Sequence, residues 1–382
     1  MRRRIKTKSM RVLLRLAVGL MMSFFVFGTS NAKNMKGFTS HERWSKKATP
    51  LSCGAEITTH AVLYNDLDCS DSSGVALTLL KGASLNLNGK KIIGNESDNC
   101  IEITGDGVKV WNGTVMNCRD GIVITGKRNE ILQVEVRDNN RVGIHITGGN
   151  SNKISSSTVN DNGREGIYIE GGNSNKIDQS TVNDNDREGI YIQRPNSNGM
   201  EGGDNNEISR SIVDNNGRQG IHIEGGESNK ISRSIVDNNG RHGIQIEAIE
   251  VDNSEETAGG NGNEIIRNTV RGSCRDGIEI DGHDNSVFFN QVEGNGNPET
   301  CDSPDDYNPW AYAGIDAVTA SGNNKIKYNY ACGNQGCKGS EDEPCAERDR
   351  NLWDENVDVD GNPVSTNEWK NNTVCPEYSP GP

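Results

Sequence analysis

The sequence has 382 residues and a formal net charge of −14, with 32% hydrophobic and only 5% aromatic residues. Residues 1–32 carry seven basic and no acidic side chains, so residues 33–382 have a net charge of −21. A charge of this sign excludes general binding to the phosphate backbone of nucleic acids, which needs clustered lysine and arginine. Such a polar composition usually indicates disorder, so evidence for a fold must come from the pattern of the residues.

The N-terminal segment has the layout of a secretory signal peptide. A basic stretch precedes an apolar run from Leu16 to Phe27, and the small residues Ser30 and Ala32 mark a cleavage site. The apolar run is shorter than the ~20 residues of a membrane-spanning helix; an N-terminal anchor helix is the alternative. We expect cleavage near Ala32, a periplasmic or secreted mature chain, and no membrane span within it.

An internal repeat with a step of 22–23 residues follows. Its first element is Gly-Ile-x-Ile, which begins at Gly143, Gly166, Gly189, Gly220, Gly243 and Gly277, with variants at Cys100, Gly121 and Gly314. Its second element is an asparagine row, formed by Asn129, Asn152, Asn175, Asn206, Asn229, Asn263, Asn285 and Asn324. Its third is a valine row, formed by Val136, Val159, Val182, Val213, Val236, Val270 and Val292.

This pattern predicts an all-β fold, a parallel β-helix of about ten coils. In Ile-x-Ile both isoleucines point to one side and x points to the other. One coil cannot bury its isoleucines, but coils stacked ~4.8 Å apart can. The asparagine row then forms a structural ladder at one corner. Leucine-rich repeats and propellers do not fit, because the repeat has no leucine scaffold, helical half or four-stranded blade.

We divide the chain into a signal peptide (1–32), an N-terminal cap segment (33–74), the β-helix (75–331) and a cysteine-containing C-terminal cap (332–382). The ten cysteines avoid the middle of the chain. An even number in an oxidising compartment predicts disulfides. Proximity alone pairs them as Cys53–Cys69, Cys100–Cys118, Cys274–Cys301, Cys332–Cys337 and Cys345–Cys375. A zinc site in the last group is the alternative, but its spacing is not standard.

The chain resembles secreted bacterial right-handed parallel β-helix repeat proteins, a group that includes NosD-like proteins and the carbohydrate-binding and sugar-hydrolase (CASH) domains. The resemblance covers roughly residues 50–375. It rests on the Gly-Ile-x-Ile and asparagine rows, on the segment Gly82–Gly89, which is similar to a first-coil motif, and on the closing segment Asn367–Cys375. The resemblance implies the right hand of the helix. It implies no single activity, because this fold hosts lyases, hydrolases, epimerases, adhesins and binding modules.

Three insertions flank the Gly-Ile-x-Ile strands. Two lie after Ile192 and Ile246, and the third lies between Val292 and Gly314. Insertions confined to one face of a solenoid often mark its binding face, although surface loops also tolerate insertion at little cost. We therefore place a candidate binding surface on the outer side of the Gly-Ile-x-Ile sheet.

Two columns of side chains face outward on this sheet. Aromatic rings offer apolar area for stacking under sugars, and acids accept hydrogen bonds from sugar hydroxyls. The predicted substrate-binding residues are His145, Tyr168, Glu170, Tyr191, His222, Glu224 and Glu247, with Tyr307, Trp310 and Tyr312 from the third insertion. A further column of arginines lies two residues before the glycine that begins each Gly-Ile-x-Ile motif. These arginines are expected to pair with nearby acids.

The C-terminal end of the same face is acidic. Glu279, Asp281 and Asp316 are predicted to lie on neighbouring coils, about 5 Å apart. Close carboxylates can act as general acid and base, as in glycoside hydrolysis. The same oxygens could hold Ca²⁺. A solvated acidic patch is the alternative to both interpretations.

The leading functional hypothesis is recognition of an extended polysaccharide or cell-surface glycan along this face, by a monomer. Cleavage by a polysaccharide lyase or glycoside hydrolase reaction is an open extension of that hypothesis. The alternative is a non-catalytic surface or periplasmic scaffold or adhesin that binds a protein partner. The net charge of −21 on residues 33–382 disfavours anionic glycans unless a cation such as Ca²⁺ bridges them.

Overall fold

A computed structural model describes residues 51–195, 202–250, 257–297, 300–301, 313–318, 322–334, 352–354 and 366–374. All of them belong to the compact unit from Thr49 to Pro382. The predicted signal peptide lies outside the described residues. Within the described part of the chain, no helix has the length and apolar character needed to cross a membrane.

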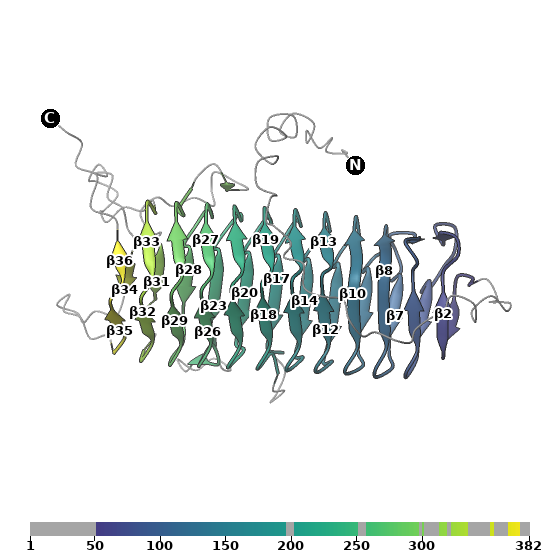
Figure 1. The fold of residues 1–382 in the computed structure, drawn as a ribbon, viewed down its shortest axis with the longest axis horizontal. Helices are drawn as coiled ribbons and strands as arrows, with labels where there is room; N and C mark the ends of the chain where they lie inside the picture. The colour runs from purple at the N-terminus through teal and green to yellow at the C-terminus, as the bar shows by residue number, and fades with distance from the viewer. Residues whose placement is uncertain are drawn as a thin grey trace, which may run out of the picture. The chain divides into compact units, whose positions relative to one another are not determined.

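The strands stack in parallel rows along one axis (Figure 1), and each coil contributes one strand to each of three rows. The first row is a twelve-stranded sheet. Its strands are β1 (Ala55–Ile57), β4 (Leu77–Leu79), β7 (Ile101–Ile103), β9 (Ile122–Ile124), β11 (Ile144–Thr147), β14 (Ile167–Glu170), β17 (Ile190–Gln193), β20 (Ile221–Glu224), β23 (Ile244–Glu247), β28 (Ile278–Ile280), β31 (Ile315–Ala317) and β34 (Leu352–Asp354).

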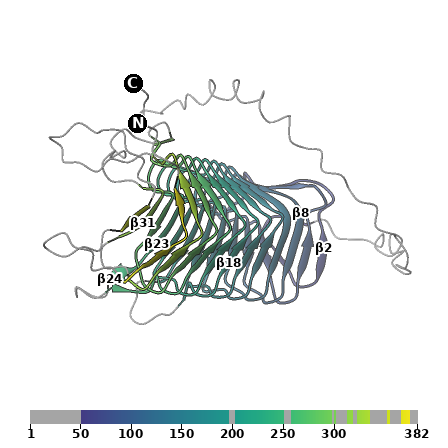
Figure 2. The ribbon, with the colours of Figure 1, turned by 60° about the vertical axis from the view of Figure 1, so that its left-hand side comes forward.

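The second and third rows follow the first in every coil (Figure 2). Two long strands, β8 (Lys109–Met116) and β10 (Glu130–Arg137), run through both rows. The second row also holds β2 (His60–Val62), β5 (Ser84–Asn86), β12 (Lys153–Ser155), β15 (Lys176–Asp178), β18 (Glu207–Ser209), β21 (Lys230–Ser232), β26 (Glu264–Ile266), β29 (Ser286–Phe288), β32 (Lys325–Lys327) and β35 (Glu368–Lys370). The third holds β3 (Leu67–Asp68), β6 (Lys91–Ile93), β13 (Thr158–Asn160), β16 (Thr181–Asn183), β19 (Ile212–Asp214), β22 (Ile235–Asp237), β27 (Thr269–Arg271), β30 (Gln291–Glu293), β33 (Tyr330–Cys332) and β36 (Thr373–Val374).

The first row has twelve strands, more than the predicted count of about ten coils. The predicted number was estimated from the repeat period, and three strands of this row lack the Gly-Ile-x-Ile motif that shows the period. β1, β4 and β34 have the sequences AEI, LTL and LWD. Leucine and alanine can occupy the inward positions at the ends of the stack, so the motif undercounts the coils there.

The interior is built from identical residues placed one above another. The register pairs Ile167 with Ile190 and Ile169 with Ile192, and these four side chains have no exposed surface. The residue between the two isoleucines points outward, as the period of two in Ile-x-Ile predicts. The hydrophobic contacts of one coil are therefore completed only by its neighbours.

Buried polar ladders follow the corners of the coils. In the predicted asparagine row, the backbone N–H of each asparagine donates to the side-chain oxygen of the next, as from Asn152 to Asn175 at 2.8 Å. A second asparagine ladder, which the sequence analysis did not identify, includes Asn162 and Asn185. A third consists of serines such as Ser180 and continues into Asn268. Buried backbone groups at the turns thus gain partners.

The glycine that begins each Gly-Ile-x-Ile motif has a reason other than the tight corner expected from sequence. Gly189 does not have a positive φ. A Cβ atom there would lie 2.5 Å from Val213 Cγ1 and 2.7 Å from the carbonyl oxygen of Gly220. The glycine is required because the next coil approaches too closely for any side chain.

Three of the five predicted disulfides are present: Cys53–Cys69, Cys100–Cys118 and Cys274–Cys301. Cys332 is also disulfide-bonded. Cys337, Cys345 and Cys375 lie outside the described residues, so the two remaining pairings stay predictions.

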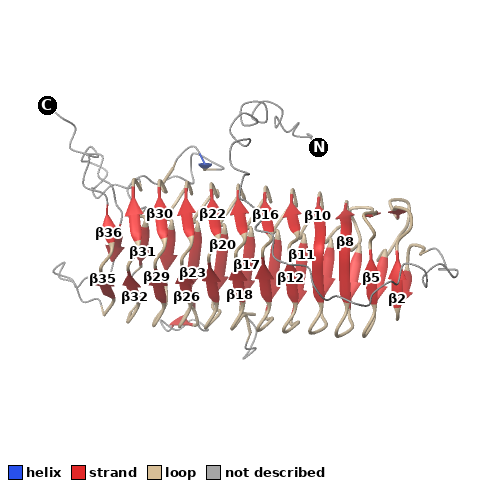
Figure 3. Cartoon of the chain, in the orientation of Figure 1, coloured by secondary structure: helices blue, strands red, loops and turns tan. Residues whose placement is uncertain are grey.

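The first and second insertions follow β17 and β23 of the first row, and the third follows β30 of the third row. The second insertion contains a short antiparallel hairpin of β24 (Ile249–Glu250) and β25 (Thr257–Ala258), which is separate from the coils (Figure 3). Of the first insertion, residues 196–201 are outside the description, as are residues 302–312 of the third.

Candidate functional site

The outer face of the first row carries the residues that the sequence singled out. The parallel register places His145 beside Tyr168, Tyr168 beside Tyr191 and Tyr191 beside His222. The same register continues through Gln245 and Glu279 to Asp316. The predicted column is therefore continuous, because an unshifted parallel sheet keeps equivalent residues in line.

The first four members of this column form a stack of rings, which we call the ring ladder (His145, Tyr168, Tyr191 and His222). Adjacent ring centroids are 4.8, 5.1 and 4.9 Å apart, and the planes are within 12° of parallel. Each tyrosine face is thus covered by a neighbouring ring. The expectation that sugars stack on the faces of Tyr168 and Tyr191 is wrong for this arrangement; the ladder presents ring edges and polar tips.

The tyrosine hydroxyls and histidine Nε2 atoms of the ring ladder contact polar side chains of the adjacent column on the next coil. The hydroxyl of Tyr168 donates to Gln193, and that of Tyr191 donates to Glu224. His222 Nε2 lies 2.8 Å from Glu247 Oε2. His145 Nε2 lies 3.3 Å from Glu170 Oε2 in the same way. These bonds fix the ring ladder, and Gln193 also donates to both oxygens of Glu224 at 3.3 Å.

The arginine column pairs with acids, as predicted, and the structure shows which ones. Glu165 and Glu188, which directly precede the glycines of their motifs, are 3% and 5% exposed. Arg187 reaches back to Glu165 at 3.3 Å, and Arg218 reaches back to Glu188 at 3.4 Å. Each pair therefore joins two coils. The arginine side chains stay partly exposed and form a rim beside the ring ladder.

A groove of about 400 Å³ runs between these columns across the coils of β14, β17, β20 and β23. This volume lies in the range of ligand-binding clefts. The lining residues are Arg164, Glu165, Tyr168, Arg187, Glu188, Tyr191, Gln193, Arg218, Gln219, His222, Glu224, Arg241 and Glu247. Five predicted substrate-binding residues line it: Tyr168, Tyr191, His222, Glu224 and Glu247. His145 and Glu170 lie one register step outside it, and Tyr307, Trp310 and Tyr312 are not described.

Burial changes the acid–base properties of the groove. Burial raises the pKa of Tyr168 and Tyr191 well above the usual range, and the hydrogen bond to Glu224 raises that of Tyr191 further. Burial lowers the pKa of His145, against the opposing charges of Asp120 and Glu170. The hydrogen bond from His222 lowers the pKa of Glu247. The tyrosine hydroxyls consequently stay protonated donors at neutral pH.

The three predicted catalytic acids lie on two neighbouring coils, those of β28 and β31. Glu279 and Asp316 are register partners on β28 and β31, and Asp316 is only 2% exposed. Asp281 follows the end of β28, where burial raises its pKa and a hydrogen bond from the Ala248 backbone opposes the shift. Among the described residues, neither Asp281 nor Asp316 belongs to a group of three ligands close enough to share a metal ion.

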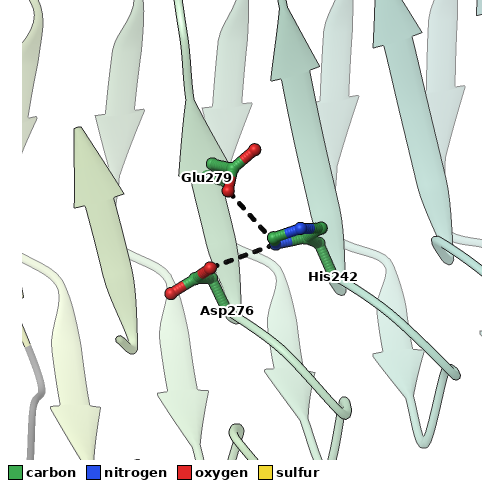
Figure 4. Close-up of side chains that lie close together, drawn as sticks. All are labelled: His242, Asp276 and Glu279. Atoms are coloured by element: carbon green, nitrogen blue, oxygen red, sulfur yellow. Dashed lines mark ion pairs between the residues drawn. The ribbon is translucent and has the colours of Figure 1, made fainter. Parts of the chain in front are cut away.

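Glu279 instead lies in a cluster that the sequence analysis missed, the histidine–carboxylate cluster of His242, Asp276 and Glu279 (Figure 4). His242 Nδ1 lies 3.1 Å from Asp276 Oδ2 and 3.5 Å from Glu279 Oε2. His242 and Asp276 directly precede the glycines of their motifs. In successive coils this position holds Glu165, Glu188, Gln219, His242 and Asp276.

The cluster is almost closed to solvent. His242 and Asp276 are 4% and 2% exposed, and only Glu279 retains appreciable exposure. Burial acts to lower the pKa of His242, but the charges of Glu279 and Asp276 outweigh it, so the pKa is raised. Burial raises the pKa of Glu279, and Asp276 adds to this while His242 opposes it. Gln245 links the cluster to the groove, since it accepts from Gln219 and donates to Glu279.

Comparison with known proteins agrees with the architecture. The family described as "Right handed beta helix region" matches residues 99–250. The A-module of the mannuronan C-5 epimerase AlgE4 of Azotobacter vinelandii is 14% identical, with a TM-score of 0.54 over 85% of this chain and 90% of that one. A double mutant of the periplasmic alginate epimerase AlgG is 15% identical, with a TM-score of 0.52 over 79% and 78%. No curated protein sequence matches. The chain is therefore a right-handed parallel β-helix protein.

Proposed function

We propose that this protein binds an extended polysaccharide along the groove of the first row. The observation that carries the proposal is the groove itself, which crosses four coils and is lined by hydrogen-bonding side chains. Equivalent side chains recur once per coil at ~4.8 Å. A polymer that lies along the helix axis would meet the same kinds of groups repeatedly, as a chain of similar sugar units requires.

The lining favours hydroxyl-rich chains over strongly charged ones. Four arginines and four glutamates line the groove, so their formal charges balance within a chain that is acidic overall. Glu224 and Glu247 would accept hydrogen bonds from sugar hydroxyls, while Arg187 and Arg218 would donate to ring or carboxylate oxygens. Tyr168 and Tyr191 would contribute ring edges and hydroxyls.

The comparisons and the sequence support the choice of ligand class and location. By their names, the two similar structures act on mannuronan and alginate, so polysaccharides are the first ligands to test. Residues 1–32 and the disulfides support a periplasmic or secreted protein. Membership of the NosD-like and CASH group, suggested by the sequence motifs, is part of the same proposal.

The decisive experiment is a binding titration of the purified protein with alginate and with a neutral glucan, by calorimetry. We expect saturable binding to at least one polymer. Tyr191→Ala and Tyr168→Ala should each weaken binding by about tenfold or more, since a central residue of a buried contact typically contributes over 1 kcal/mol. Tyr328→Ala is the matched control, because Tyr328 is stacked on Phe289 at 5.1 Å outside the groove lining.

Cleavage of the bound polymer is a finer proposal that rests on Glu279, Asp281 and Asp316. Release of new reducing ends would be measured for the same polymers, with and without Ca²⁺. Glu279→Gln and Asp316→Asn should abolish release while leaving groove binding intact. If no polymer binds while a folded preparation captures a protein partner through this face, the scaffold or adhesin interpretation replaces the proposal.

A further inference from the structure

We propose that the histidine–carboxylate cluster is a binding site for one Zn²⁺ ion. His242 would supply Nδ1, and Asp276 and Glu279 would each supply one carboxylate oxygen. The three side chains come from two neighbouring coils, those of β23 and β28. No part of this inference depends on the binding of a glycan.

The distances between the ligand atoms suit a single ion. Zinc binds imidazole nitrogen at about 2.0–2.1 Å and carboxylate oxygen at about 2.0–2.2 Å. Two ligands at such distances in a tetrahedron are about 3.4 Å apart. Nδ1 of His242 is 3.1 Å from Asp276 and 3.5 Å from Glu279, and all three ligand atoms lie within 4.8 Å of one another. An ion could therefore enter with little rearrangement.

A second observation points to a ligand rather than a simple ion pair. The side chain of His242 is only 5% exposed, and its Nδ1 faces both carboxylates without meeting hydrogen-bond geometry to either. A buried polar atom without a hydrogen bond is costly. In the preceding coil the equivalent position holds Gln219, which does hydrogen-bond, to Gln245. A metal ion would bind His242 Nδ1 directly, in place of its ion pairs with Asp276 and Glu279.

The donor set distinguishes zinc from calcium. Ca²⁺ takes six to eight oxygen ligands, whereas Zn²⁺ combines imidazole nitrogen with carboxylates in a four-coordinate site. Three protein ligands leave one position for water or another small ligand, an arrangement found in catalytic zinc sites. Glu279 is the member of the cluster that reaches the surface, with 17% of its side chain exposed.

The test measures zinc binding by the purified protein after a chelator has removed any bound metal. The stripped protein is dialysed against Zn²⁺ in the presence of excess Ca²⁺, and the bound zinc is measured by elemental analysis. We expect one zinc per chain and a zinc-dependent rise in Tm. His242→Gln should weaken binding about 100-fold or more, since even loss of an outer-shell partner costs 10–100-fold. Glutamine occupies this column in the preceding coil, so the variant should fold.

His222→Gln is the matched control, because His222 lies on the same face and pairs with a single carboxylate, Glu247. It should retain the zinc. Glu279→Gln, which copies Gln245 of the same column, should lose it. Circular dichroism verifies that each variant is folded. Failure of the folded wild type to retain zinc, displacement of the zinc by Ca²⁺, or equal binding in His242→Gln would each overturn the proposal.

Discussion

The asparagine ladder of the interior and the columns of the first outer face are built on the same geometry, with one side chain per coil at the coil spacing. In the ladder the side chain scarcely changes, and Asn129, Asn152 and Asn175 repeat the same bond at 2.8 Å. On the outer face the residue changes from ring to amide to acid along one column, as in Tyr191, Gln245 and Glu279. A position that keeps the same residue type in successive coils is needed for the coils to stack. A position whose residue type varies from coil to coil is free to carry a function.

We expect substitutions in the buried ladders to destabilise the protein most. Asn185, in the second asparagine ladder, accepts hydrogen bonds from Asn162 and donates to Val159 O and Asn216. Asn185→Ala leaves buried donors and acceptors without partners, at roughly 1–3 kcal/mol each, so we expect a loss of about 3 kcal/mol in the free energy of unfolding. Denaturant unfolding followed by circular dichroism measures it.

The matched control is Asn183→Ala in the same coil. The Asn183 side chain donates to its neighbour Asp184 in an exposed setting. We expect its removal to change the free energy of unfolding by less than about 0.5 kcal/mol, as is usual for surface substitutions. Equal effects of the two variants would show that the ladder does not hold the coils together as described.

The same contrast explains what could be predicted from sequence. Isoleucine pairs and the row from Asn129 to Asn324 repeat because backbone contacts demand them, so periodicity alone reveals the coil. The outer columns could be aligned, and Tyr168 and Tyr191 were correctly placed side by side. Their ring planes could not be predicted, since stacking depends on rotamers. His242 and Asp276 were missed because sequence shows neither how deeply the position before each glycine is buried nor which residues converge there.

A second prediction concerns the ring ladder at alkaline pH. The pKa values of Tyr168 and Tyr191 are raised in the folded protein, chiefly by burial. The stabilising effect of their protonated forms is complete below the ordinary tyrosine pKa of about 10 and is lost as pH rises above it. We expect the free energy of unfolding to fall above pH 10 and to fall less in a Tyr168→Phe, Tyr191→Phe double variant.

Absorbance titration of tyrosinate provides an independent measurement of the same effect. Tyr64 is 50% exposed and serves as the internal reference. The two ladder tyrosines should ionise only after the exposed ones, and the double variant should lack this late phase. Simultaneous ionisation of all tyrosines in the folded wild type would mean that the ring ladder is open to solvent.

The smallest effect is expected at the N-terminal end of the ring ladder in mild acid. Burial lowers the pKa of His145, and the charges of Asp120 and Glu170 only partly oppose this, with Arg141 acting in the same direction as burial. Because the unfolded chain binds this proton near pH 6.5 and the folded chain binds it less readily, the stability contribution is complete above pH 6.5 and falls as the pH decreases below it. His145→Gln should flatten this part of the stability profile, as measured by denaturant unfolding between pH 7.5 and 5. An unchanged profile would mean that Glu170, 3.3 Å from His145, fully offsets the effect of burial on the His145 pKa. A charged side chain at this end of the ring ladder would then cost no more than one on the exposed surface.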